Sequence, residues 1–359
     1  MKYEGEQVWF PLSEDILSWD DDFHELMLRD HLRMVSYEAA IKEVVKPCMT
    51  VADIGTGTGI LALWALEAGA KHVYGIEANP VRIPQALQRI VNAGYSERFT
   101  VHNALSYDVN LQERVDIIIS EILGNLGDNE DMTPILADAR TRFLKENGKV
   151  LPQKVTTYLT PVSSVKAHQQ VKDKVCKGIN EQYSLSDILR KLGINNQFDL
   201  YYDCILPKST YLSEPQAVKE FNFDANDDSE YQTKIAYLVN KDGILTGFKG
   251  HFVAQLSDKV ILDISGDDID RRKTSDCWKH CFLPIESTVE VMQGDVIELD
   301  YQRFYPVDRS IPFRQCYSWK GVVKCNGVNI HEFYHGTCKE KFRNMNYDKN
   351  LNIANTGNY

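Results

Sequence analysis

The sequence predicts an α/β domain built on a doubly wound parallel sheet, followed by an antiparallel β domain that carries a helical arm. Two observations lead to this prediction. In the first half, short apolar strands alternate with helical stretches, whereas from residue 155 onward β-branched and aromatic runs are separated by turns. Pro152 lies where the first pattern stops. With 359 residues the chain is long enough for two packed domains.

The first half begins with a helix-like run at residues 36–45. Each strand after it is followed by a candidate helix or loop, as in a doubly wound sheet. The predicted strands are residues 50–55, 72–77, 99–103 and 115–120. We expect this domain to cover residues 34–152.

The second half is typical of an antiparallel barrel or sandwich. Its predicted strands are residues 155–162, 233–240, 246–256, 259–265, 296–305 and 317–324. Residues 167–193 look helical, because leucine and isoleucine recur at helix spacing at Leu185, Ile188, Leu189 and Leu192. We expect the barrel domain at residues 153–345, with this arm inserted, and a C-terminal tail at 346–359.

The composition favours a globular protein with a cationic partner. Its net charge of −11 argues against a protein that grips phosphate backbones, so we expect no nucleic acid partner. An acidic surface that only keeps the protein soluble is the alternative. The sequence lacks a membrane helix and a signal peptide, which predicts a cytoplasmic protein. Its eight scattered cysteines show no metal-ligand spacing, so we expect free thiols and no metal site.

A glycine-rich segment at residues 51–61 is the strongest local motif. It runs from a strand through Gly55, Gly57 and Gly59 into a helix, and glycines let the backbone approach a ligand closely. Glu77 ends the next strand and could bind the two ribose hydroxyls of a nucleoside. A dinucleotide-dependent dehydrogenase shares this arrangement. Against it, the glycine spacing is GxGxG instead of GxGxxG, and nothing downstream suggests hydride chemistry.

Two glutamates, Glu121 and Glu130, stand in the loop that follows the strand at residues 115–120. Ligands in open α/β sheets bind at the carboxyl ends of the strands, which is where this loop begins. Two carboxylates brought together repel each other unless one is protonated or a cation lies between them. A guanidinium is the matching cation, since it is planar, permanently charged and bidentate. The alternative is a surface loop that carries acids without a ligand.

The stretch from Phe23 to Leu159 resembles the catalytic core of the protein arginine methyltransferases. The similar segments are FHELMLRDHLRMVSYEAAI, VADIGTGTGIL, YGIEAN, SEILGNLGDNE and FLKENGKVLP. The double-glutamate loop is most similar to that of the symmetric-dimethylating branch. The resemblance implies a Rossmann-like class I methyltransferase domain, a β-barrel domain with a dimerisation arm, S-adenosylmethionine as the cofactor, and a homodimer. Residues 1–33 would then be a helical segment that covers the cofactor.

The resemblance also implies roles for individual residues. Glu121 and Glu130 would clamp the guanidinium, Met27 would lie beside the reactive methyl group, Asp30 could accept a proton through water, and Trp278 would face the substrate. The residues expected to bind the cofactor are Arg33, Asp53, Gly55, Gly57, Glu77, Ala78, Ser106 and Glu121.

The sequence departs from the family pattern at two places. The N-terminal helix lacks the paired tyrosines, so Trp19 or Phe23 would have to cover the cofactor. Cys277 replaces the histidine of the Thr-His-Trp motif within the predicted strand at residues 274–284, so Asp30 would lose its histidine partner.

Several functions agree with these residues. The first is methylation of an arginine in a protein or peptide. The second is methylation of free arginine or another small guanidine, whose carboxylate could bind Arg271, Arg272 or Lys273. An inactive scaffold that binds the cofactor and a class I methyltransferase that acts on another atom are further alternatives.

Overall fold

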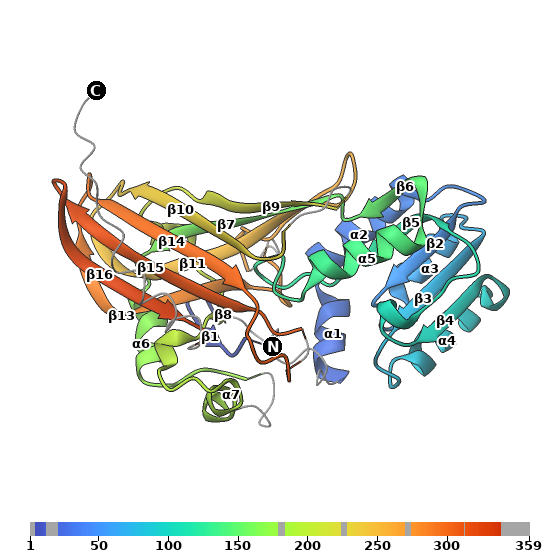
Figure 1. The fold of residues 1–359 in the computed structure, drawn as a ribbon, viewed down its shortest axis with the longest axis horizontal. Helices are drawn as coiled ribbons and strands as arrows, with labels where there is room; N and C mark the ends of the chain where they lie inside the picture. The colour runs from blue at the N-terminus through green and yellow to red at the C-terminus, as the bar shows by residue number, and fades with distance from the viewer. Residues whose placement is uncertain are drawn as a thin grey trace.

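The computed structural model describes residues 4–11, 21–178, 184–223, 228–269, 274–311 and 313–338. A parallel sheet with helices forms one half of the molecule, and antiparallel sheets form the other (Figure 1). Within the described residues, no helix combines the length and the apolar character needed to cross a bilayer.

The first half contains a five-stranded sheet in the order β4-β3-β2-β5-β6, with all neighbouring pairs parallel. The strands are β2 (Thr50–Ile54), β3 (His72–Glu77), β4 (Phe99–Asn103), β5 (Val115–Ser120) and β6 (Leu144–Leu151). The helical elements are α2 (His31–Val44), α3 (Ile60–Glu67), α4 (Ile83–Asn92), η2 (Ser96–Arg98), η3 (Ser106–Asp108) and α5 (Met132–Phe143). The central strands are buried on both faces, as apolar side chains in β2 and β5 require. This confirms the predicted doubly wound domain.

The second half is a barrel made of two antiparallel sheets. The seven-stranded sheet has the order β1-β8-β13-β11-β7-β9, with β12 paired to β11, and the four-stranded sheet has the order β10-β14-β15-β16. The first sheet contains β1 (Val8–Trp9), β7 (Lys154–Val162), β8 (Tyr202–Cys204), β9 (Gln216–Asn222), β11 (Gly243–Gln255), β12 (Ile261–Asp263) and β13 (His280–Val291). The second contains β10 (Tyr231–Leu238), β14 (Val296–Phe304), β15 (Cys316–Cys325) and β16 (Val328–Gly336). One core, with Phe248 from the first sheet and Trp319 from the second, joins them.

The helical arm differs from its prediction in two ways. It is not continuous: α6 (Val165–Lys172) and α7 (Leu185–Leu192) are separate, and Lys174 adopts a left-handed φ of 58° that ends the first helix. The resemblance implies an arm that pairs with a second subunit, so the leucine stripe of Leu185, Leu189 and Leu192 would lie exposed in a single chain. These leucines are instead buried against the chain's own barrel, together with Val171 and Phe198. The short turns η4 (Gln197–Asp199) and η5 (Lys208–Thr210) follow the arm.

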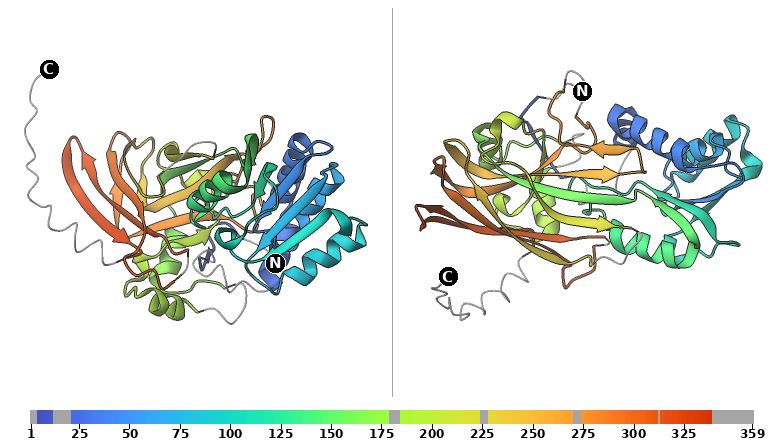
Figure 2. Two further views of the ribbon diagram at one scale, coloured as in Figure 1. Left: turned by 45° about the vertical axis from the view of Figure 1, so that its right-hand side comes forward. Right: turned by 90° about the horizontal axis from the view of Figure 1, so that it is seen from above.

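The N-terminal segment is only partly helical. Helix α1 (Asp21–Arg29) lies between the two halves (Figures 1 and 2). The strand β1 pairs instead with β8 of the barrel, so the prediction that residues 1–33 are one helical cover is wrong for residues 8 and 9. Trp19 and the tail at 346–359 lie outside the described residues.

Candidate active site

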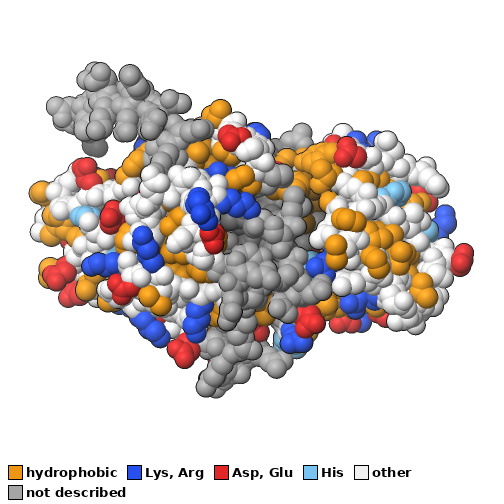
Figure 3. All heavy atoms as spheres, turned by 90° about the horizontal axis from the view of Figure 1, so that it is seen from below, with side chains coloured by type: hydrophobic (Ala, Val, Ile, Leu, Met, Phe, Trp, Pro, Cys, Tyr) orange, Lys and Arg blue, Asp and Glu red, His pale blue; other side chains and the backbone are white. Residues whose placement is uncertain are grey.

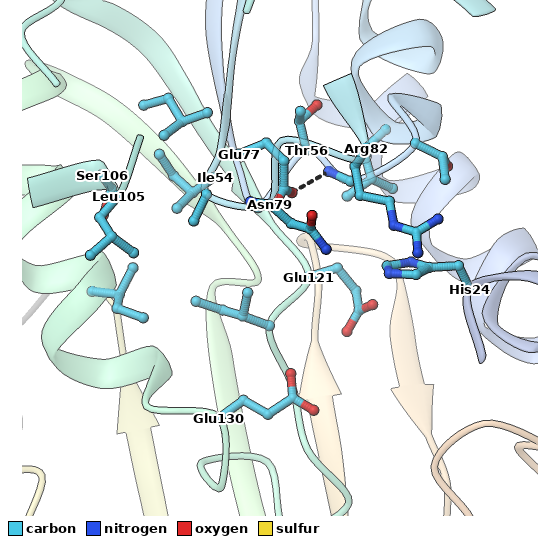
Figure 4. A pocket seen from close by; sticks show the side chains of 18 of the residues that line it. His24, Ile54, Thr56, Glu77, Asn79, Arg82, Leu105, Ser106, Glu121 and Glu130 are labelled. Carbon is cyan, nitrogen blue, oxygen red and sulfur yellow. Dashed lines mark hydrogen bonds between the residues drawn. The ribbon is translucent and has the colours of Figure 1, made fainter. Parts of the chain in front are cut away.

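A cavity of about 190 Å³ opens where the parallel strands end. Most of its walls come from the residues at and after the ends of β2, β3, β4 and β5. Helices α1, α2 and α5 also contribute, as does Phe313 from the barrel half. Because parallel strands share one carboxyl edge, residues far apart in the sequence meet there. In Figure 4, Glu121 is drawn between Glu77 and Glu130.

The glycine-rich turn and Glu77 form one end of this cavity. The backbone N–H of Gly57, which has a left-handed φ of 51°, donates to Glu77 Oε2 at 2.8 Å, and Asn79 N donates to Oε1 at 2.7 Å. Burial raises the pKa of Glu77. Asp53 lies fully buried below the turn, where it accepts a hydrogen bond from Thr56 at 2.6 Å. Burial raises the pKa of Asp53 to about 7. The sequence-predicted turn and carboxylate therefore meet around one cavity.

Arg33 bonds directly to Glu121. Its Nε donates to Glu121 Oε2 at 2.7 Å, its Nη2 also pairs with this oxygen, and its Nη1 donates to the carbonyl of Met27 at 3.1 Å. Both side chains are nearly buried. Burial alone would lower the pKa of Arg33, but the Glu121 carboxylate raises it above its usual value. Glu121 is thus already a guanidinium-binding carboxylate in this structure.

Glu130 lines the same cavity as Glu121 and is buried. Burial, and then repulsion from Glu121, raise the pKa of Glu130 well above its usual value. Among the described residues no hydrogen bond to its carboxylate is formed. Of the two loop glutamates, Glu121 is therefore neutralised by an internal guanidinium, whereas Glu130 is a carboxylate that a cationic ligand would stabilise.

Asp30 has other partners in place of the histidine. It caps α2 by accepting from Arg33 N at 3.0 Å, and its second oxygen accepts from the Ser275 hydroxyl at 2.5 Å and from Cys277 N at 3.1 Å. Burial and the Asp30 carboxylate raise the pKa of the Cys277 thiol well above its usual value. Asp30 itself is 1% exposed and lies outside the cavity lining. This geometry suits a residue that joins α2 to the barrel.

Trp278 contacts the double-glutamate loop on the side away from the cavity. Its Nε1 donates to the carbonyl of Leu123, and its ring packs edge-on against Phe252 with centroids 5.1 Å apart. It is not part of the cavity lining. The predicted strand at 274–284 is wrong at its start. Residues 274–279 form a turn, in which Lys279 N donates to Ser275 O and Lys279 has a φ of 55°, and β13 begins at His280.

Two family profiles match consecutive parts of the chain. The profile of the ribosomal protein L11 methyltransferase (PrmA) matches residues 36–151, and that of the PRMT5 oligomerisation domain matches residues 154–320. The probable protein arginine N-methyltransferase 6 of Arabidopsis thaliana is 37% identical over 142 residues, which are 39% of this chain and 32% of that protein. The probable histone-arginine methyltransferase CARM1 of Oryza sativa subsp. indica is 36% identical over 152 residues, 41% of this chain and 28% of that protein.

The resemblance to the protein arginine methyltransferases is confirmed. The matched part spans about a third of the length of these curated relatives. The fold is shared more widely. Arginine methyltransferase 10 of Arabidopsis thaliana matches 90% of this chain and 99% of its own, with a TM-score of 0.75 and 21% identity. The PRMT1 enzyme–prozyme heterotetrameric complex with AdoHcy of Trypanosoma brucei matches 87% of this chain and 96% of its own, with a TM-score of 0.72 and 19% identity.

Most arginine methyltransferase positions predicted from the sequence meet at the cavity. Those that line it are Met27, Arg33, Gly55, Gly57, Glu77, Ala78, Ser106, Glu121 and Glu130. Asp30, Asp53 and Trp278 lie behind this lining. The sequence reasoning missed Asn79, Arg82, Tyr107 and Phe313. His24, three residues before Met27 on α1, also lines the cavity, although a lone histidine on such a helix is more often a packing or solvent contact. Phe313 had no local signal, because only the barrel fold brings it here.

Proposed function

We propose that the chain is an S-adenosylmethionine-dependent methyltransferase that acts on an arginine guanidinium. The observation that carries this proposal is the ion pair between Arg33 and Glu121, at 2.7 Å, within the cavity that also holds Glu77 and Glu130. A carboxylate that binds one guanidinium has the charge and geometry to bind another. Glu130 supplies a second buried carboxylate beside it.

The residues present fit the cofactor. The backbone at Gly57 is exposed to the cavity in a left-handed conformation, so that a side chain there would be strained. Glu77 would bind the ribose hydroxyls, and the remaining N–H groups of Arg33 would bind the carboxylate. Met27 would border the methyl group. The cofactor supplies a sulfonium methyl that is already activated, so the protein's task is to place a nitrogen in line with it.

Glu121 and Glu130 would orient the substrate guanidinium. Bonds to two of its nitrogens localise positive charge away from the third, which then becomes the better nucleophile. Glu130 is the better candidate to accept the proton released afterwards, because its raised pKa makes it the stronger base. Asp30, whose two oxygens already accept hydrogen bonds, has less capacity for this role.

An arginine in a protein or peptide is the substrate that we favour, with free arginine as the second candidate. The net charge of −11 raises the local concentration of cationic peptides and makes their binding sensitive to salt. Free arginine gains less from this charge and needs a cationic anchor for its carboxylate. The anchors expected from the sequence, Arg271, Arg272 and Lys273, lie outside the described residues. The inactive scaffold is disfavoured by the two glutamates in the cavity.

A homodimer remains a proposal. It does not rest on the arm's leucines, which are buried within the chain, but on other apolar side chains that are exposed. Helix α4 and its N-terminal turn expose Val81, Leu87 and Val91, and the arm exposes Val165 and Val175. Figure 3 shows hydrophobic side chains gathered on the underside of the parallel-sheet half. Pairing of these apolar surfaces in two copies would bury both. Light scattering at micromolar concentration tests this, and a fully active monomer would contradict a required dimer.

Methyl transfer from labelled cofactor is the deciding experiment. Free arginine, an arginine-glycine-rich peptide and a cell extract are offered at two salt concentrations, and mass spectrometry identifies the products and the symmetry of methylation. We expect the peptide to have the higher specificity constant, by a ratio that falls as salt rises. If free arginine has the higher specificity constant at both salt concentrations, free arginine and not the peptide is the substrate. Label on no guanidine would overturn the proposed function.

A further inference from the structure

The loop that carries Glu130 is held from the barrel side by charged and phenolic side chains. Arg303 on β14 forms ion pairs with Asp128 (Nε to Oδ2, 3.6 Å) and with Asp131 (Nη2 to Oδ1, 3.3 Å). The hydroxyl of Tyr317 donates to Asp128 at 3.3 Å, and that of Tyr305 donates to Asp131. The barrel therefore contacts the loop on both sides of Glu130, at Asp128 and at Asp131.

The arginine at the centre of these contacts is deeply buried. Arg303 is 1% exposed, and so is the side chain of Asp128. A guanidinium keeps its charge even when buried, so Arg303 attracts both carboxylates at any pH at which the protein folds. Loss of Arg303 would leave Asp128 as an uncompensated buried carboxylate, and such a group draws in water or moves toward it.

The loop around Glu130 is irregular, although internal hydrogen bonds such as Leu126 N to Asn129 Oδ1 at 2.9 Å and Asp131 N to the Asp128 carbonyl at 3.3 Å hold its backbone. No helix or strand covers residues 121–131, and Asp131 has a left-handed φ of 61°. A non-glycine residue in this conformation persists when surrounding contacts hold it. The barrel supplies such contacts through Arg303 and Tyr305, which bond the Asp131 carboxylate.

The charges around the loop divide between two arginines. Arg33 pairs with Glu121, whereas Arg303 pairs with both Asp128 and Asp131. Glu130 is the carboxylate that neither arginine pairs with. It is left to a cation that enters the cavity. Arg303 does not line the cavity and so does not reach that cation itself.

We propose that Arg303 is a positioning residue for Glu130, through which the barrel sets the geometry of the carboxylate pair. This role rests on the proposed function. It differs from general support of the fold, because it predicts a change in Glu130 chemistry and not only in stability.

Arg303→Met and Arg303→Lys test the role in the full-length chain. We expect Arg303→Met to bind the cofactor normally by calorimetry but to lower kcat on the order of 100-fold, as a misplacement near 1 Å does. The acid limb of its pH–rate profile should shift to lower pH, because a loosened Glu130 gains solvent and its pKa falls toward the usual value. Arg303→Lys keeps one ion pair and should recover part of kcat.

Lys324→Met is the matched control. It removes another cation of the same sheet, whose Nζ lies 2.6 Å from Glu298 on β14 and which does not line the cavity. Its kcat and pH profile should equal those of the wild type. If Arg303→Met does not fold, Tyr305→Phe removes the hydroxyl that bonds Asp131 and keeps the ring beside Arg303. It should lower kcat less, with the pH shift in the same direction.

The outcomes separate the two proposals. Suppose that the wild type is active, and that the Arg303 and Tyr305 variants have a smaller folded fraction but an unchanged pH–rate profile. That result would overturn the positioning role alone. A wild type that methylates no guanidine would overturn the proposed function and this role together.

Discussion

The guanidinium of Arg33 and the carboxylate of Glu121 form a buried ion pair, with Nε 2.7 Å from Oε2, at the centre of the candidate site. Glu130 shares the cavity without such a partner. The two glutamates therefore have unequal surroundings, although they would act together on a substrate.

Glu121→Gln and Glu130→Gln should differ in stability and agree in turnover. Glu121→Gln leaves the buried Arg33 charge uncompensated, so we expect the free energy of unfolding to fall by up to about 3–5 kcal/mol. Glu130→Gln removes a carboxylate that burial disfavours, and should leave stability unchanged or raise it. Both should lose most of the turnover. Urea unfolding and single-turnover transfer measure these effects. A near wild-type rate in either variant would remove that residue from the clamp.

The pH dependence of turnover should report Glu130. Its pKa lies well above the usual value, and the clamp needs the ionised form, so kcat/KM should fall as pH decreases through that raised pKa. A bound guanidinium favours ionisation, so the limb in kcat should lie at lower pH than the limb in kcat/KM. The pH profile of the residual activity of Glu130→Gln should lack this fall at low pH. If the limb persists in this variant, another group controls it.

Cofactor binding should depend on Gly57 and Glu77. A β-branched residue is strained at the φ of 51° at Gly57, so Gly57→Val should abolish binding in a folded chain. Gly94→Val is the control, because Gly94 has a φ of 80° in open space and does not line the cavity. Glu77→Ala should weaken binding by about 1.5–3 kcal/mol. Calorimetry measures all three. Equal affinity in Gly57→Val and Gly94→Val would place the cofactor elsewhere.

Trp278→Phe tests whether this residue positions the loop or contacts the substrate. It removes the Nε1 bond to Leu123 and keeps an aromatic ring against Phe252. We expect kcat to fall between about tenfold and 100-fold with little change in the peptide KM, because the loop shifts. The control Trp319→Phe loses a similar bond, 2.8 Å to Pro284 O, inside the barrel, and should lose stability only. A raised KM with unchanged kcat would instead indicate a substrate contact.

Lys249 should make stability depend on alkaline pH. Its Nζ donates to the Tyr211 hydroxyl at 2.5 Å and to Ser265 O at 3.0 Å, and burial lowers its pKa to about 7. Between this value and the unfolded pKa near 10.4 the unfolded chain binds more protons, so the free energy of unfolding should rise with pH across that window. Lys249→Met should lack this rise. Urea unfolding from pH 6 to 10 compares the slopes, and parallel slopes would contradict the shifted pKa.

Much of the parallel-sheet half was predictable because its signals are local. The glycine-rich turn, the acid at the end of β3 and the two glutamates after β5 stand where strands end. In a parallel sheet all such ends meet at one edge, so their sequence positions alone determine that they converge. The resemblance to the arginine methyltransferases rested on the same residues.

Long-range contacts determine the partners of the charged side chains, which the sequence did not predict. Three sets of contacts join segments that are 88 to 245 residues apart. They are the ion pair of Arg33 with Glu121, the hydrogen bond from Ser275 to Asp30, and the ion pairs of Arg303 with Asp128 and Asp131. The turn before β13 and the burial of the arm's leucines also depend on packing against other elements. A local pattern fixes which face of a segment is apolar and where its chain turns. Which distant side chain neutralises a buried charge is decided only when both are removed from water together. The sequence alone therefore determined that the glycine-rich turn, Glu77 and the two loop glutamates share this site, and the tertiary structure decided their partners and added residues such as Phe313.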